Sequence, residues 1–266
     1  MTYRIPKAGS LKKTNHQQVM RLFGLIGYPL GHSFSQQYFS EKFMREGITD
    51  AQYELFPIPV IGDLEQVLRE QPALCGLNVT IPYKELVLPY LHELDETARA
   101  VGAVNCIRIR DGRLTGFNTD VYGFEQSLRN SLGPVVPSSQ ALILGTGGAS
   151  KAVAFVLRKM GIGYRFVSRK ADAESGWLNY DDLRELNWSE YHLVVNTTPL
   201  GTYPKTDGCP DLPFEKLSAQ HLVFDLVYNP PQTVLLRHAS EQNARVQNGL
   251  EMLQLQAEKA WDIWQQ

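Results

Sequence analysis

The chain has 266 residues, of which 43% are hydrophobic and 20% are charged, an ordinary balance for a globular protein of one large or two modest domains. A net charge of −2 gives no indication of a nucleic-acid or membrane-surface role, and no apolar run approaches the ~20 residues that a membrane helix needs. Cys75, Cys106 and Cys209 form no CxxC pair and no metal-ligand cluster, so we expect free thiols in a reducing cytoplasm and no metal site.

The N-terminal segment differs in character from the rest of the chain. Residues 1–19 contain basic residues but no acidic residue, and they lack the apolar core of a signal peptide. A strand pattern then begins at Met20. We therefore expect residues 1–19 to be an expression tag or a leader, and the fold to begin at Met20.

The first 117 residues alternate between strand and helix patterns. In chain order they predict a strand at 22–27, a helix ending near Glu46, a strand at 53–56, a helix at about 62–70 and a strand at 76–80. Pro82 can open a further helix. Four apolar residues then have the spacing of one helical face: Leu91, Leu94, Ala98 and Val101. Residues 104–117 contain two strand patterns separated by Asp111-Gly112, which predicts a two-residue hairpin and completes an N-terminal α/β domain.

The residues after Asn118 predict a second α/β unit. Their pattern contains a helix from about Tyr122, a proline-containing connection at 133–140, a glycine turn, a helix ending at Gly161 and strands at 164–168, 192–196 and 221–227. This alternation is typical of a doubly wound parallel sheet that binds a nucleotide. A final amphipathic helix carries these residues on its apolar face: Leu250, Leu253, Ala257, Ala260, Trp261 and Trp264.

The glycine turn has the order of a phosphate-binding motif. Residues 141–150 read Ala-Leu-Ile-Leu-Gly-Thr-Gly-Gly-Ala-Ser, an apolar run that ends in glycines and continues as a helix. Gly145, Gly147 and Gly148 fit the first part of the dinucleotide fingerprint, and Ser150 replaces its third glycine. The motif predicts a nucleotide pyrophosphate at the helix N-terminus, where backbone N–H groups and the helix dipole favour negative charge. A purely structural glycine turn is the alternative.

The end of the following strand indicates which dinucleotide is bound. An NAD site usually places Asp or Glu there, against the ribose 2′-hydroxyl. This chain has Ser168-Arg169-Lys170 instead, and a guanidinium can grip a 2′-phosphate with two parallel hydrogen bonds. The sequence therefore favours NADP, with a solvated basic loop as the alternative.

Residues 78–84, Asn-Val-Thr-Ile-Pro-Tyr-Lys, place polar groups where a strand meets a helix. Asn78 and Thr80 point to the same side of a strand, so both can face a cleft. Lys84 would lie in the first turn of a helix, where the dipole disfavours an ammonium unless a carboxylate is near. Asp120 is the candidate carboxylate, and a coupled Lys–Asp pair can hold and release a proton near neutral pH. From spacing alone, a solvated surface lysine is the alternative.

Other polar residues have both functional and ordinary interpretations. Ser33 and Ser35 can offer two hydroxyl donors beside a helix start, which suits a carboxylate, although Ser35 can equally be a plain N-cap. Asn105 stands before a hairpin strand, where a turn residue is the alternative. Gln256 lies on the final helix, where an ordinary surface position is the alternative.

Together these segments resemble the shikimate dehydrogenase family, from about Met20 to Gln256. The matching blocks are Gly-His-Ser-Phe-Ser-Gln (31–36), Asn-Val-Thr-Ile-Pro-Tyr-Lys (78–84), Gly-Ala-Val-Asn (102–105), Gly-Phe-Asn-Thr-Asp (116–120), Gly-Thr-Gly-Gly-Ala-Ser (145–150), Asn-Thr-Thr-Pro-Leu-Gly (196–201), Asp-Leu-Val-Tyr-Asn-Pro (225–230) and Gly-Leu-Glu-Met-Leu-Gln-Leu-Gln (249–256). Several blocks in the right order are far more specific than any one of them.

The resemblance implies a reversible hydride transfer, in which NADPH reduces 3-dehydroshikimate to shikimate in the chorismate pathway to aromatic amino acids. It implies that Lys84 is the acid–base group and Asp120 its partner. By the same resemblance the substrate-binding residues are Ser33, Ser35, Asn78, Thr80, Asn105, Tyr228 and Gln256, the first two and Tyr228 at the carboxylate. The implied NADP-binding residues are Gly145, Gly147, Gly148 and Ala149 at the pyrophosphate, and Ser168 and Arg169 at the 2′-phosphate.

The resemblance also implies the domain organisation. We expect a substrate domain of residues 20–117 plus 240–266 and a Rossmann-type NADP domain of residues 118–239. The C-terminal helix is expected to return to the first domain and carry Gln256 to the cleft. The expected protein is a cytoplasmic monomer or homodimer that binds a small-molecule substrate, with no nucleic-acid or membrane partner.

The chain departs from the family pattern at four positions: Cys106, Val121, Ser168 and Pro199. Three alternative functions also stay open. One is a quinate/shikimate dehydrogenase that uses NAD or both cofactors, and another is an aminoshikimate-type enzyme. The third is a catalytically silent homologue that only binds shikimate.

Overall fold

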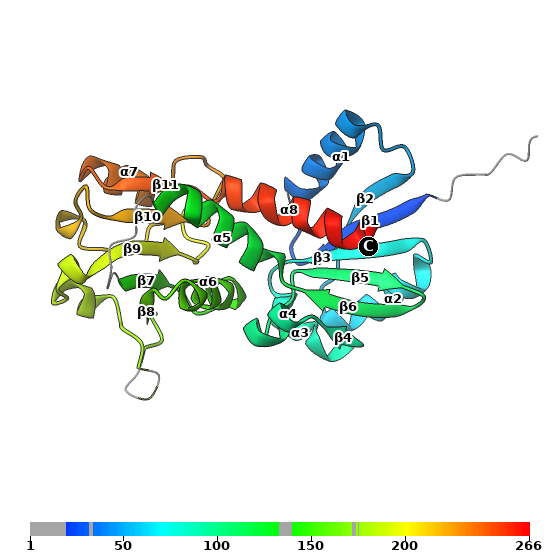
Figure 1. Cartoon of the computed structure of the whole chain (residues 1–266), viewed down its shortest axis with the longest axis horizontal. Coiled ribbons are helices and arrows are strands. Elements are labelled where there is room, and N and C mark those ends of the chain that lie inside the picture. Colours follow the sequence, from blue (N-terminus) through cyan, green and yellow to red (C-terminus); the bar gives the residue numbers. More distant parts are fainter. Residues whose placement is uncertain (1–19, 32–33, 133–139, 172–173, 175) are drawn as a thin grey trace, which may run out of the picture.

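The structure is a computed structural model, which describes residues 20–31, 34–132, 140–171, 174 and 176–266. These residues form one six-stranded sheet and one five-stranded sheet, with helices packed on both (Figure 1). The expected tag or leader at 1–19 and the expected site residue Ser33 lie outside the described residues. Within the described part of the chain, no helix is long and apolar enough to cross a membrane.

The first sheet has the strand order β2-β1-β3-β5-β6-β4. Its strands are β1 (Arg21–Gly27), β2 (Ala51–Pro57), β3 (Leu74–Val79), β4 (Glu93–Leu94), β5 (Cys106–Arg110) and β6 (Arg113–Phe117). Its helices are α1 (Phe34–Glu46), α2 (Leu64–Glu70), α3 (Tyr83–Leu86) and α4 (Glu96–Val101). The β5–β6 hairpin turns at Asp111 and Gly112, whose φ values are 50° and 73°. Asp tolerates a positive φ better than most residues do, and Gly adopts it freely. This is why an Asp-Gly pair predicts the turn.

The expectation of one helical face from Leu91 to Val101 was wrong at its start. Helix α4 begins only at Glu96, because the Asp95 carboxylate accepts a hydrogen bond from the Ala98 N–H at 2.8 Å and caps the helix. Leu94 belongs to β4 and pairs with Gly116 of β6. A Cβ at Gly116 would lie 2.6 Å from Leu91 and 2.9 Å from Leu94. Because glycine has no Cβ, both leucines can pack against the sheet.

The second sheet is parallel throughout, in the order β11-β10-β9-β7-β8. Its strands are β7 (Gln140–Leu144), β8 (Gly163–Val167), β9 (Tyr191–Asn196), β10 (Leu222–Asp225) and β11 (Arg245–Gln247), and its main helices are α5 (Thr119–Leu132), α6 (Gly148–Lys159), α7 (Val234–Glu241) and α8 (Leu250–Gln265). The predicted α/β class and doubly wound parallel sheet are confirmed. Its apolar core lies on both faces of the sheet, under α5 and α6 on one face and α7 on the other.

Helix α5 starts at Thr119, a few residues before the predicted start near Tyr122. The side chain of Asn118 accepts a hydrogen bond from the Val121 N–H at 3.3 Å, which favours a helix start at this point. Asp120 therefore lies in the first turn of α5, where the helix dipole favours a carboxylate.

Helices α5 and α8 run side by side and connect the two sheets (Figure 1). The helices approach closely because Gly123 of α5 has no side chain: a Cβ there would lie 2.5 Å from the Met252 carbonyl oxygen. At its far end α8 packs Trp264 against Phe23 of β1, with ring centroids 4.9 Å apart. The Trp264 indole N–H also donates to the Ile107 carbonyl at 3.0 Å. The expected return of the C-terminal helix to the first sheet is therefore confirmed.

Candidate active site

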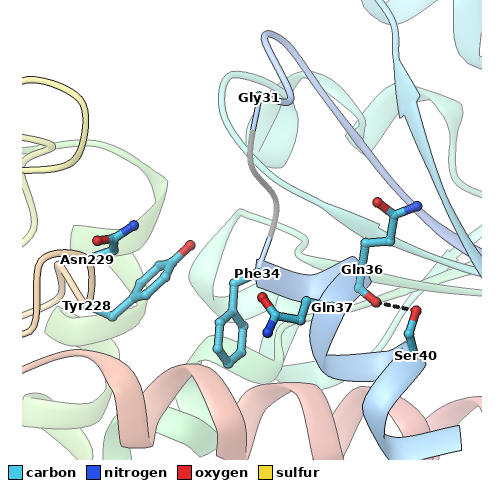
Figure 2. Close-up of a pocket in the computed structure, with 7 residues that line it drawn as sticks. All are labelled: Gly31, Phe34, Gln36, Gln37, Ser40, Tyr228 and Asn229. Carbon is cyan, nitrogen blue, oxygen red and sulfur yellow. Dashed lines mark hydrogen bonds between the residues drawn. The ribbon is translucent and has the colours of Figure 1, made fainter. Parts of the chain in front are cut away.

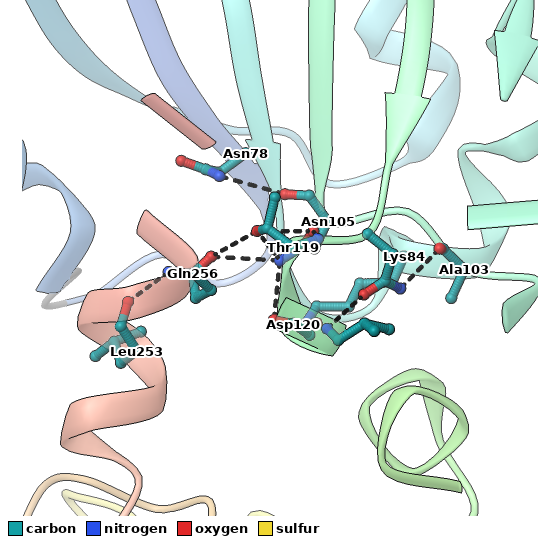
Figure 3. A network of polar contacts seen from close by, with 10 residues as sticks. Asn78, Lys84, Ala103, Asn105, Thr119, Asp120, Leu253 and Gln256 are labelled. Atoms are coloured by element: carbon teal, nitrogen blue, oxygen red, sulfur yellow. Dashed lines mark hydrogen bonds and ion pairs between the residues drawn. The ribbon is translucent and has the colours of Figure 1, made fainter. Parts of the chain in front are cut away.

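An ion pair between the two sheets forms the centre of the candidate site. Lys84 lies in α3, the single helical turn that follows β3, and its Nζ atom is 2.7 Å from Asp120 Oδ2 on α5 (Figure 3). The two side chains are only 18% and 8% exposed. Water is thus largely excluded from the pair, although the Lys84 side chain keeps some exposure. The structure brings together the lysine and carboxylate that the sequence suggested as partners.

Asn105 connects the ion pair to the rest of the site. Its side-chain N–H₂ donates to Asp120 Oδ1 and to Thr119 Oγ1, both at 2.9 Å, and its Oδ1 atom accepts from the Thr119 N–H at 2.6 Å. The two oxygens of Asp120 therefore have separate partners, Lys84 on one and Asn105 on the other. This arrangement restrains the carboxylate and, through it, the position of the ammonium.

Gln256 reaches the same network from α8. Its Oε1 atom lies 3.3 Å from both the Asn105 side-chain nitrogen and the Thr119 hydroxyl, and its N–H₂ donates to the Leu253 carbonyl at 2.9 Å (Figure 3). Thr119 was not singled out from the sequence. Its only signal was its position between Asn118 and Asp120 in a block that matches the family.

Asn78 is buried beside this network at the end of β3. Its Oδ1 atom accepts from the Tyr53 hydroxyl at 2.8 Å, and its side-chain nitrogen lies 3.3 Å from the Asn105 carbonyl oxygen. Thr80 follows the strand, with its methyl group close to Gly27. Among the described residues, the Thr80 hydroxyl makes no hydrogen bond to this network.

A polar cavity of about 460 Å³ lies between α1 and the segment after β10. It is lined by Gly31, Phe34, Gln36, Gln37, Ser40, Tyr228 and Asn229 (Figure 2). Tyr228 packs edge-on against Phe34, with ring centroids 5.4 Å apart. Burial raises the pKa of Tyr228, although a hydrogen bond from the Phe34 backbone partly opposes it. The phenol is therefore a neutral hydrogen-bonding group beside the helix that carries Ser35.

The glycine turn leaves an open approach to the N-terminus of α6. Gly145 has φ of 105°, in the left-handed region that favours glycine, and a Cβ there would lie 2.8 Å from the Thr197 hydroxyl. Gly147 precedes α6 with nothing within 4 Å of an added Cβ. A Cβ on Gly148 would lie 3.4 Å from Lys84. The turn thus fits a pyrophosphate and lies directly beside the candidate acid–base group.

Ser150 closes the turn from inside, since its buried hydroxyl donates to the Gly147 carbonyl at 2.6 Å. This bond explains how serine replaces the third glycine of the motif. One residue further, the Lys151 ammonium lies 2.5 Å from the Glu85 carboxylate of α3. Both groups are part-exposed, so the pair contributes little to stability, but it joins the helix of the glycine turn to the helix of Lys84.

The loop after β8 holds the residues expected at the 2′-phosphate. Ser168 is buried, and its hydroxyl accepts from the Lys170 N–H at 3.1 Å. Its own N–H donates to the Leu178 carbonyl at 2.8 Å. Arg169 is exposed. Ser168 therefore shapes the loop, while the Arg169 guanidinium stays accessible to an anion.

A buried carboxylate that the sequence did not single out connects β9 and β10. Asp225 accepts hydrogen bonds from the Asn196 side chain at 2.9 Å and from the Thr233 hydroxyl at 2.6 Å. Burial raises the pKa of Asp225 despite these bonds. Asn196 also accepts from the Thr198 hydroxyl at 2.7 Å, so Asp225 supports the loop whose Thr198 methyl group would lie 3.2 Å from a Cβ added at Gly145. Both residues lay in matching blocks but had no assigned role.

Two of the four departures from the family pattern have a clear structural setting. Val121 is buried in α5, and its N–H donates to the Asn118 side chain, so it continues the helix that carries Asp120. Cys106 is fully buried, and burial raises the pKa of its thiol well above the usual range. Neither residue takes a polar group away from the network.

Comparisons with known proteins agree with this arrangement. Residues 25–107 match the family model for the shikimate dehydrogenase substrate binding domain. The chain is 36% identical over 260 residues to the shikimate dehydrogenase (NADP(+)) of Desulforamulus reducens, covering 91% of this chain and 88% of the relative. It is 38% identical over 261 residues to the protein of that name from Methanocaldococcus jannaschii, covering 92% and 91%.

Solved structures give the same result. The shikimate 5-dehydrogenase of Thermus thermophilus in complex with NADP(H) and shikimate has a TM-score of 0.79 and 34% identity, covering 92% of this chain and 93% of that one. The ligand-free 5-ketofructose reductase of a Gluconobacter species has a TM-score of 0.76 and 28% identity, covering 92% of each chain. With identities above 30% over nine-tenths of its length, the chain belongs to the shikimate dehydrogenase family.

Proposed function

We propose that the protein is an NADP-dependent shikimate dehydrogenase that reversibly reduces 3-dehydroshikimate to shikimate, as a step of the chorismate pathway. The observation that carries the proposal is the Lys84–Asp120 ion pair beside the N-terminus of α6. The names of the relatives and the ligands of the Thermus thermophilus structure support the substrate and the cofactor.

In the proposed mechanism Lys84 moves the proton. During reduction its ammonium donates a proton to the carbonyl oxygen of the substrate, on which negative charge develops, and during oxidation the neutral amine takes the hydroxyl proton. Asp120 holds the ammonium at 2.7 Å and is itself held by Asn105. NADP, when bound, supplies or accepts the hydride.

The remaining polar groups are proposed to orient the substrate. Asn78, Asn105 and Gln256 are buried amides whose positions are restrained by other hydrogen bonds, so they can recognise ring hydroxyls without reorganising. Thr80 borders them, and Asp120 is also expected to contact a hydroxyl. At the opposite end, Tyr228 and the serines at positions 33 and 35 are proposed to bind the carboxylate.

The second sheet is proposed to hold NADP. The backbone of Gly145, Gly147, Gly148 and Ala149 would bind the pyrophosphate, because the N–H groups of the first turn of α6 are directed to an open side of the turn. Ser168 and Arg169 would lie at the 2′-phosphate. We also propose a substrate domain of residues 20–117 and an NADP domain that starts at residue 118; the expected boundary at 239/240 moves past 247, because β11 pairs with β10 in the parallel sheet, and α8 then returns to the substrate domain.

Replacement of Arg169 by alanine should raise the KM for NADP⁺ about tenfold or more, because one charge-assisted contact to the 2′-phosphate is lost. The KM for NAD⁺ should change little, since NAD lacks that phosphate. Steady-state kinetics with both cofactors measures the difference. An equal rise for both cofactors would contradict the assignment of Arg169 to the phosphate.

The decisive experiment mixes the protein with shikimate and NADP⁺ and follows NADPH absorbance. We expect turnover with a kcat/KM higher for NADP⁺ than for NAD⁺. Parallel assays with quinate and aminoshikimate test the related dehydrogenase activities. Shikimate binding in calorimetry without any turnover would instead identify a silent homologue.

A further inference from the structure

A buried tyrosine outside the assigned site contacts Asn78, one of its proposed substrate residues. Tyr53 belongs to β2, and its ring stacks on Phe39 of α1 with centroids 4.6 Å apart. Its hydroxyl donates to Asn78 Oδ1 at 2.8 Å. Only 6% of Tyr53 is exposed, so the ring is a core residue whose polar end reaches the site.

The hydrogen bonds define which way the Asn78 amide faces. Its side-chain nitrogen lies 3.3 Å from the Asn105 carbonyl oxygen, which can only accept, so the nitrogen is the donor on that side. The Asn78 oxygen is therefore the atom that receives the single proton of Tyr53. Since Tyr53 fixes which way the amide faces and the Asn105 carbonyl takes one N–H, Asn78 has its second N–H to offer a ligand.

The Tyr53 hydroxyl is a stable donor for the bond to Asn78. Burial raises the pKa of Tyr53 well above its usual value, so the phenol stays protonated at neutral pH. One buried hydroxyl of β2 thus restrains a residue of β3.

Packing in the core alone would not require a hydroxyl at position 53. Phenylalanine would preserve the stacking on Phe39, while a buried hydroxyl costs free energy unless it is hydrogen-bonded. We propose that Tyr53 is a positioning residue of the substrate site: it orients the Asn78 side chain so that an N–H faces a substrate hydroxyl. This inference rests on the proposed function and extends it to a residue that does not touch the substrate.

The variant Tyr53→Phe tests the proposal, because it removes the hydroxyl and keeps the ring. We expect the KM and the Kd for shikimate to rise about three- to tenfold, kcat to stay within about twofold, and the KM for NADP⁺ to stay unchanged. Tyr83→Phe is the matched control, since its buried phenol donates to the Ile58 carbonyl at 2.6 Å instead. It should show a similar loss of thermal stability with an unchanged shikimate KM.

A double-mutant cycle separates positioning from general loosening. In an Asn78→Ala background, Tyr53→Phe should change the shikimate Kd by less than about twofold, because its main partner is already gone. A wild-type Kd in Tyr53→Phe, or an equal fold-change in both backgrounds, would overturn the proposal. If the wild-type protein oxidises shikimate and Tyr53→Phe binds shikimate with the wild-type Kd, this inference is wrong and the proposed function stands. Wild-type protein that neither binds nor oxidises shikimate overturns the proposed function and the inference together.

Discussion

Replacing Lys84 by alanine is expected to lower kcat by about 10²- to 10⁴-fold while shikimate still binds. The Lys84 side chain lies beside the N-terminus of α6, and its ammonium is held at 2.7 Å by Asp120. Its loss leaves the developing oxyanion without a proton source, whereas the amides of Asn78, Asn105 and Gln256 remain to bind the substrate. Steady-state turnover together with calorimetric binding of shikimate measures both parts of this prediction.

Two further variants show whether the proton or the charge matters. Lys84→Arg keeps a positive charge but cannot give up a proton near neutral pH, so it should stay strongly impaired. Lys159→Ala removes a lysine from another ion pair, 2.7 Å from Glu125, and should retain turnover close to wild type. Near-normal turnover of Lys84→Ala would refute the acid–base role assigned to this residue.

Replacing Gly123 by alanine is expected to lower kcat/KM for shikimate about 10- to 100-fold, although Gly123 is not itself a member of the ion pair. An added Cβ would lie 2.5 Å from the Met252 carbonyl oxygen and 3.0 Å from Gln256 Cβ, so α8 must move away from α5. A displacement of about 1 Å at a residue that orients the substrate is enough for an effect of this size. The loss should appear mainly in the KM for shikimate, because Gln256 moves and Lys84 does not.

The same substitution should destabilise the fold. Overpacking costs about 1–3 kcal/mol, which outweighs the gain of up to about 1 kcal/mol from alanine in a helix, and Tm should fall by several degrees. Gly62→Ala is the control, since the nearest atom to its added Cβ is the Tyr90 hydroxyl at 3.9 Å. It should leave Tm and kcat/KM close to wild type. Unchanged kinetics in Gly123→Ala would mean that α8 can adjust without moving Gln256.

Local patterns in the sequence were sufficient for most of the secondary structure. The hairpin at Asp111-Gly112 and the parallel strands after Asn118 follow from turn chemistry and from alternating runs, which act between near neighbours. The start of α4 was wrong because apolar spacing cannot show that Asp95 caps the helix while Leu94 pairs with a distant strand. The short strand β11 was not predicted, because three residues are too few to show the apolar–polar alternation of a strand.

The site itself was only partly accessible from the sequence. Matching blocks indicated Lys84 and Asp120 as partners, and the structure places them 2.7 Å apart. The blocks did not assign roles to Thr119 or Asp225, because the hydrogen bonds of these residues reach groups far along the chain. Tyr53 gave no signal at all, since its aromatic ring fits the pattern of an ordinary buried strand.

By itself the sequence determined the α/β class, the dinucleotide-binding turn and the identities of the polar residues, because these depend on local spacing and on blocks of contiguous residues. Only the tertiary structure decided which of those residues meet. Asn105 and Gln256 are 151 positions apart, and they approach because Gly123 lets α8 pack on α5 and because Trp264 anchors α8 on the first sheet. Such contacts depend on the packing of whole elements, which no local pattern encodes.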